Sequence, residues 1–335
     1  IIINYYFDCD EVWIDAWNAY GDFNEHVART IIKQICDPNL IVGTIGTGEL
    51  QWVSEDKPLH YNIFFENDED FATAPAQQVS IRQPLDEKVD PYSVRLGDFG
   101  FSNLQFEVPE NTINYHTVLQ TKDSLGVNVE VTAGLDLVNR EVFWVFNSID
   151  PVTGAAPYNP LIGMLPVNDS TGKGEGYVNY RVLPANDVQT NDIINAQASI
   201  VFDINSPVIT NEWFNTIDAN APTSLVNDLP ATTTNTEIEL SWTGQDDGSG
   251  VATYALYVSK DDEAFKVYAD TLTTNSITYE GIVGHTYRFF TVATDNVGHQ
   301  EALKTEAEAS ITIEPAAFVN ITSPIEGDSF CGESI

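Results

Sequence analysis

The sequence predicts an all-β protein made of tandem β-sandwich domains, with one short helix near the N-terminus. Between residues 44 and 313, short runs with alternating or continuous β-type patterns recur, and Gly, Pro, Asn and Asp separate them. Helical periodicity is confined to one segment close to the start. The 335 residues are enough for two or three domains, each with its own core.

The N-terminal segment, residues 1–43, differs from the rest. Asp22 can cap a helix across 23–35, where apolar side chains recur at helical spacing: Phe23, Val27, Ile31 and Ile35. We expect this segment either to close a preceding domain or to donate a strand to a neighbour. The first seven residues lack the basic region and cleavage site of a signal peptide, so we expect the chain to be the interior of a longer protein.

The three cysteines have no zinc-type spacing. If the protein is extracellular, a Cys9–Cys36 disulfide is expected, which leaves Cys331 over.

Residues 44–215 are predicted to form the first β-sandwich. The long loop 150–175 interrupts its strands, which are expected at 59–66, 78–83, 93–96, 113–121, 126–133, 141–149, 177–183 and 193–202.

Residues 221–313 are predicted to form a second sandwich, and 314–335 a linker with the first strand of another module. The strand 237–242 alternates, with Ile238, Leu240 and Trp242 on its inner face. Further strands are expected at 251–259 and 284–295.

The charge of −36, from 50 acids against 14 bases, argues against nucleic acids and anionic membranes as partners. No apolar run approaches the roughly 18 residues of a membrane span, so no membrane insertion is expected. Bound divalent cations would relieve the self-repulsion. The alternative is an acid-coated secreted protein from a saline habitat.

Three oxygen-rich stretches favour a calcium site at the joint between the sandwiches. In such a domain the chain start and two of the loops share one end, so six residues are candidate ligands: Asp218, Asn220, Asp246, Asp247, Asp295 and Asn296. Calcium takes six to eight oxygen ligands at about 2.3–2.6 Å. The alternative is that these side chains cap turns. A second metal site at Glu66, Asp68 and Asp70 competes with an exposed turn as the explanation.

No nucleophile, phosphate-loop or metalloprotease motif occurs, and the five histidines match no metal-ligand spacing. Among 50 acids, two carboxylates could lie by chance at the separation that glycoside hydrolases use for catalysis, so such a pair alone would not indicate an enzyme. The chain is therefore predicted not to be an enzyme.

Five separated motifs resemble those of an uncharacterised extracellular module of very large secreted, Bacteroidetes-like bacterial surface proteins. They occur in order at 65–76, 95–100, 148–154, 174–177 and 201–205, and Cys36-Asp-Pro-Asn39 stands at the usual start. The resemblance covers about residues 36–220. It implies an extracellular, surface-exposed setting and carries over no catalytic activity.

Residues 221–313 resemble fibronectin type III and bacterial immunoglobulin-like domains. In these families a tyrosine, here Tyr287, anchors a corner through its hydroxyl. The resemblance implies the fold and says little about function, because such modules have many roles.

Together these features predict a non-catalytic structural or adhesive segment of a secreted cell-surface protein, rigidified by calcium at the joint. Its expected partners are neighbouring domains, copies of itself, and surface glycans or proteins. One alternative is a filament subunit that donates residues 1–7 or 317–325 as a strand. Another is an accessory region of a secreted hydrolase.

Overall fold

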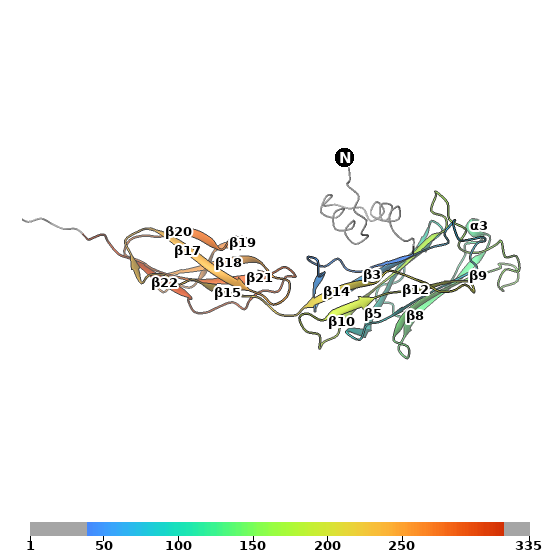
Figure 1. The fold of residues 1–335 in the computed structure, drawn as a ribbon, viewed down its shortest axis with the longest axis horizontal. Coiled ribbons are helices and arrows are strands. Elements are labelled where there is room, and N and C mark those ends of the chain that lie inside the picture. Colours follow the sequence, from blue (N-terminus) through green and yellow to red (C-terminus); the bar gives the residue numbers. More distant parts are fainter. Residues whose placement is uncertain (1–38, 318–335) are drawn as a thin grey trace, which may run out of the picture. The chain divides into compact units, whose positions relative to one another are not determined.

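The computed structural model describes residues 39–317 and divides the chain into two compact units, residues 1–219 and 220–335 (Figure 1). The all-β prediction is confirmed: the helix of the described part is the four-residue α3 (Lys122–Leu125). No helix among these residues is long and apolar enough to cross a membrane. The helix expected at 23–35 and the Cys9–Cys36 pair lie outside the described residues.

The first unit contains two large antiparallel sheets (Figure 1). One has the order β1 (Leu40–Val42), β3 (Leu59–Glu66), β10 (Glu175–Pro184), β5 (Val89–Phe101), β6 (Leu104–Phe106). The other has the order β13 (Val208–Ile209), β12 (Ser199–Phe202), β4 (Gln78–Pro84), β9 (Glu141–Ile149), β8 (Asn128–Asp136), β7 (Tyr115–Leu119).

The inner faces of these two sheets form one core. Burial alternates along β3 and β9, as expected for strands with one buried face. Phe146 of β9 lies 6.1 Å from Phe65 and 5.6 Å from both Phe99 and Phe101, between ring centroids. Side chains from both sheets therefore interlock across the sandwich.

A small third sheet joins β11 (Ile193–Ala196), β14 (Trp213–Asp218) and β2 (Trp52–Ser54). The segment 193–202, predicted as a single strand, is two strands in different sheets. The chain changes sheet at Ala198, whose N–H donates to the hydroxyl of Thr210. Strand β14, at the end of the predicted first sandwich, was not predicted. It pairs in parallel with β2, and Asp218 stands opposite Ser54.

The second unit is a sandwich of two sheets. Their orders are β15 (Thr223–Val226), β17 (Glu237–Gln245), β20 (Ser276–Glu280), and β16 (Thr232–Thr233), β22 (Ala309–Ile313), β21 (Thr286–Asp295), β18 (Val251–Lys260), β19 (Lys266–Leu272). Ile238, Leu240 and Trp242 are buried on the inner face, as predicted. The hydroxyl of Tyr287 accepts a hydrogen bond from the Ile282 N–H at 2.9 Å, which confirms the expected corner anchor.

Two glutamates of the segment between β21 and β22 connect β15 to β21, which belong to different sheets. Glu301 accepts hydrogen bonds from the backbone N–H groups of Ser224 and Ala293, both at 3.0 Å. Glu308 accepts from those of Val226 at 3.0 Å and Thr291 at 3.1 Å. The carboxylates thus satisfy backbone donors that no strand partner reaches.

Lys304 lies between the two carboxylates and forms an ion pair with each. Its ammonium lies 2.9 Å from Glu301 Oε1 and 2.5 Å from Glu308 Oε1, and both glutamate side chains are 10% exposed. Burial raises the pKa of Glu301, but hydrogen bonds from Ser224, Lys304 and the Ser224 and Ala293 N–H groups outweigh it, so the pKa is lowered. The ionised form of Glu301 is therefore the one that the fold stabilises.

Candidate cation-binding loops

In the second unit, the loop after β17 turns around Asp246. Its Oδ2 accepts hydrogen bonds from Gly248 N at 3.1 Å and Gly250 N at 2.6 Å. Gly250 has φ +85°, a conformation that few residues other than glycine adopt. The other oxygen, Oδ1, is buried and receives no hydrogen bond within residues 39–317. A buried anionic oxygen without a donor is costly and is a suitable ligand for a hard cation.

Asn220 and Asn296, two further predicted ligands, both contact this loop. The amide of Asn220 donates to Asp247 Oδ2 at 3.1 Å. The amide of Asn296 donates to the carbonyls of Ser249 and Gly250, both at 2.8 Å. The start of the unit and two of its loops therefore meet, as the sequence predicted for residues 220–296.

Both carboxylate oxygens of Asp295, unlike those of Asp246, have hydrogen-bond partners. Its Oδ1 accepts hydrogen bonds from the N–H groups of Val297, Gly298 and His299, at 2.9, 2.6 and 2.8 Å. Its Oδ2 lies 2.9 Å from Nδ1 of His299. Both oxygens have partners, which agrees with turn capping, so Asp295 is a weaker candidate ligand than Asp246 or Asp247.

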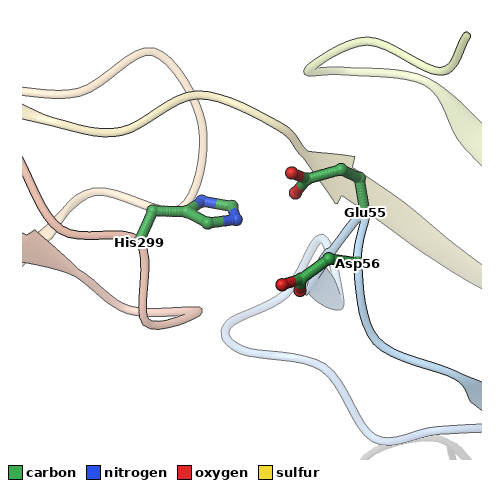
Figure 2. A group of neighbouring side chains, drawn as sticks. All are labelled: Glu55, Asp56 and His299. Carbon is green, nitrogen blue, oxygen red and sulfur yellow. The ribbon is translucent and has the colours of Figure 1, made fainter. Parts of the chain in front are cut away.

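His299 was not predicted to contribute to the site. Its position four residues after Asp295, beyond a turn containing Gly298, is the signal that could have indicated it. Figure 2 shows the ring on the loop that follows β21.

In the first unit, Asp218 ends β14 beside two carboxylates that were not predicted. Glu55 and Asp56 follow Ser54, the residue opposite Asp218, and lie next to each other on the turn beyond β2 (Figure 2). The Ser54 hydroxyl donates to Glu55 Oε2 at 3.3 Å and lies 2.5 Å from Asp56 Oδ1. The sequence gives no signal for this group because the parallel pairing of β2 with β14 joins distant segments.

The second proposed metal group has separate partners. Glu66 accepts a hydrogen bond from the amide of Asn168. Asp68 caps its own turn, with Oδ1 2.8 Å from Asp70 N. A cation at Glu66, Asp68 and Asp70 remains a prediction, and the Asp68 turn agrees with the simpler alternative.

Comparison with known protein families finds a match in part of the first unit. Residues 161–216 match a domain of unknown function, DUF7619. The DUF7619 match covers β10 to β13 and most of β14. Comparison with the curated proteins gives no match.

Among solved structures, a collagen-binding domain from a Staphylococcus aureus adhesin is 9% identical, with a TM-score of 0.26 over 54% of this chain and 97% of its own. Domains D2 and D3 of the Corynebacterium diphtheriae major pilin SpaD are 8% identical, with a TM-score of 0.31 over 77% and 82%. The Bacillus cereus major pilin subunit BcpA is 11% identical, with a TM-score of 0.27 over 82% and 70%. Similarity this low carries no argument about function, and the fold assignment rests on the strand pairing described above.

Proposed function

We propose that this chain is a non-catalytic structural segment of a secreted cell-surface protein, with two β-sandwich units in series and a calcium ion that stiffens their joint. The observation that carries the proposal is that each unit, taken by itself, gathers side-chain oxygens close to the residue at which the chain passes from one unit to the next, 219–220. In the first unit, Asp218 ends β14 opposite Ser54, which Glu55 and Asp56 follow. In the second unit, Asn220 at the start contacts Asp247, next to Asp246 in the loop after β17.

Each unit has its own hydrophobic core. The first core ends at Ile217 with Ala219 packed on it, and the second begins at Val226. A short connection between independent cores is a hinge unless something restrains it. A rod-like segment of a surface protein requires that motion at this hinge be restricted, and a bound ion at the connection would restrict it.

Covalent geometry makes a shared ion feasible. Ala219 alone separates Asp218 from Asn220, so the Cα atoms of these two residues stay within about 7 Å. Asn220 in turn contacts Asp247. In the proposed site Asp246 Oδ1 and Asp247 bind the ion from the second unit, and Asp218 supplies an oxygen from the first.

Removing calcium should lower the melting temperature of the second unit. If the dissociation constant is about 10 μM, 1 mM calcium raises the free energy of unfolding by about 2.7 kcal/mol. This corresponds to a rise in melting temperature of roughly 10–20 °C for a domain of this size. Calorimetry in 1 mM calcium and in EDTA measures this shift.

Two double variants with the same change in net charge distinguish the loss of calcium ligands from a general reduction of negative charge. Asp246→Asn with Asp247→Asn keeps the turn acceptors and should abolish the calcium response. Asp228→Asn with Asp270→Asn, both exposed, changes the net charge equally and should preserve it. Equal melting temperatures in calcium and EDTA for the wild type would rule out the clamp.

The alternative function is filament assembly by strand donation, and one structural feature favours it: an open sheet edge in the second unit. Strand β19 is an open sheet edge with Val267 and Tyr268 exposed. The candidate donor at 1–7 and nearly all of the one at 317–325 lie outside the described residues.

A further inference from the structure

A row of basic side chains crosses the outer face of the first unit's β3–β10–β5 sheet. Arg181 of β10 stands opposite His60 of β3 on one side and opposite Arg95 of β5 on the other. Directly opposed side chains on neighbouring strands have Cβ atoms about 4.5–5.5 Å apart, and like charges in this arrangement are destabilising.

The two arginines have no carboxylate partner within residues 39–317. Arg95 Nη1 donates to the carbonyls of Tyr92 and Val94, at 2.9 and 2.7 Å. Arg181 Nη2 reaches Asn111 Oδ1 at 3.4 Å. These contacts hold the guanidinium groups in place without neutralising them.

The other described arginines have partners elsewhere in the two units. Arg82 pairs with Glu141, and Arg288 pairs with Asp262. Arg140 donates to the carbonyls of Asp86, Glu87 and Val89. Arg140 also lacks an acidic partner within the described residues, but three carbonyls surround its guanidinium. Among the described arginines, Arg95 and Arg181 stand out because they lie directly opposite each other on neighbouring strands with no carboxylate partner.

A pocket lies at this row. Its volume is about 290 Å³, and it combines the two guanidinium groups with amide, hydroxyl and apolar surface from Pro58, Ser93, Arg95, Asn111, Arg181, Val182 and Leu183. This volume is close to the lower end of the range for ligand pockets, which suits a ligand of one sugar ring or one amino acid.

The positive charge of Arg181 also affects the pKa of His60, which lies opposite it on β3. Partial burial, and then the positive charge of Arg181, lower the pKa of His60. His60 is therefore uncharged at neutral pH, and its imidazole can serve as a hydrogen-bonding group beside the two cations.

We propose that Arg95 and Arg181 form a binding site for a compact carboxylate ligand, of the size of a single acidic sugar or acidic amino acid. The planar guanidinium matches a carboxylate in a bidentate arrangement. The side-chain amide of Asn111 offers a polar group for the rest of the ligand, and Pro58 and Leu183 offer an apolar wall. This site is independent of the proposed calcium clamp.

Titration with glucuronate, N-acetylglutamate and neutral glucose, followed by calorimetry or by shifts of the arginine resonances, tests the site. At least one carboxylate should bind and glucose should not. The tighter carboxylate then identifies the source, an acidic sugar or an acidic amino acid.

Variants assign the binding to the pocket. Arg95→Gln with Arg181→Gln should weaken binding at least tenfold, and Arg181→Lys should weaken it too, because the charge remains while the bidentate fork is lost. Arg82→Gln, which removes a paired arginine from the other large sheet of the same unit, should leave binding unchanged. Failure of both carboxylates to bind, equal binding of glucose, or an equal loss in Arg82→Gln would overturn the proposal.

Discussion

Trp242→Ala is expected to lower the melting temperature of the second unit by roughly 15 °C or more while leaving the first unit's transition in place. The side chain is 1% exposed and contacts Tyr254 at 5.9 Å between ring centroids. Replacing a buried tryptophan by alanine costs about 3–5 kcal/mol, and each kcal/mol corresponds to about 4–8 °C in a domain of this size. Differential scanning calorimetry resolves the two transitions.

Trp242→Phe is the matched control. The indole N–H is buried and has no acceptor in the described part of the chain, so phenylalanine removes an unsatisfied donor along with some volume. Its cost should be well below that of alanine. If Trp242→Ala shifts both transitions together, the two units do not fold independently and the tandem description fails.

Lys304→Met is expected to destabilise the second unit by about 3 kcal/mol. The substitution leaves the carboxyl groups of Glu301 and Glu308 largely buried and without their shared cation. Removing one partner of a buried charge network is far more costly than losing an exposed ion pair. Urea denaturation at neutral pH measures the loss.

Lys266→Met supplies the comparison, since its ion pair with Glu263 is exposed on both sides and should contribute less than about 1 kcal/mol. Acidification provides a second check. Because the fold lowers the pKa of Glu301, its contribution to stability is present above the carboxyl's unfolded pKa and is lost as the pH falls through the folded value. The penalty of Lys304→Met should therefore shrink below about pH 4. A penalty equal to that of Lys266→Met, or one that does not change with pH, would contradict this description of the cluster.

Local patterns predicted most of the strands because one buried face imposes an alternation that is visible in the sequence. Strands β3 and β9 have the predicted bounds, and Ile238, Leu240 and Trp242 lie inside as expected. The Tyr287 corner could be predicted because it depends on residues close in sequence.

Features that depend on distant pairing could not be predicted in this way. Strand β14 pairs with β11 and also with β2, which lies more than 150 residues earlier, and Asp218 lies opposite Ser54 only through the pairing with β2. The arginine row needs the register of β3, β10 and β5, which no local pattern fixes. Glu301 and Glu308 were not singled out from the sequence, because the backbone donors that they satisfy belong to two strands of different sheets.

The proposed clamp is tested most directly by the rotational correlation time of each unit, obtained from backbone 15N relaxation in calcium and in EDTA. With calcium, both units should share one long correlation time, and in EDTA each should show its own shorter value. The Asp246→Asn, Asp247→Asn variant should behave in calcium as the wild type does in EDTA. Correlation times that are the same in calcium and EDTA would contradict a joint stiffened by the ion.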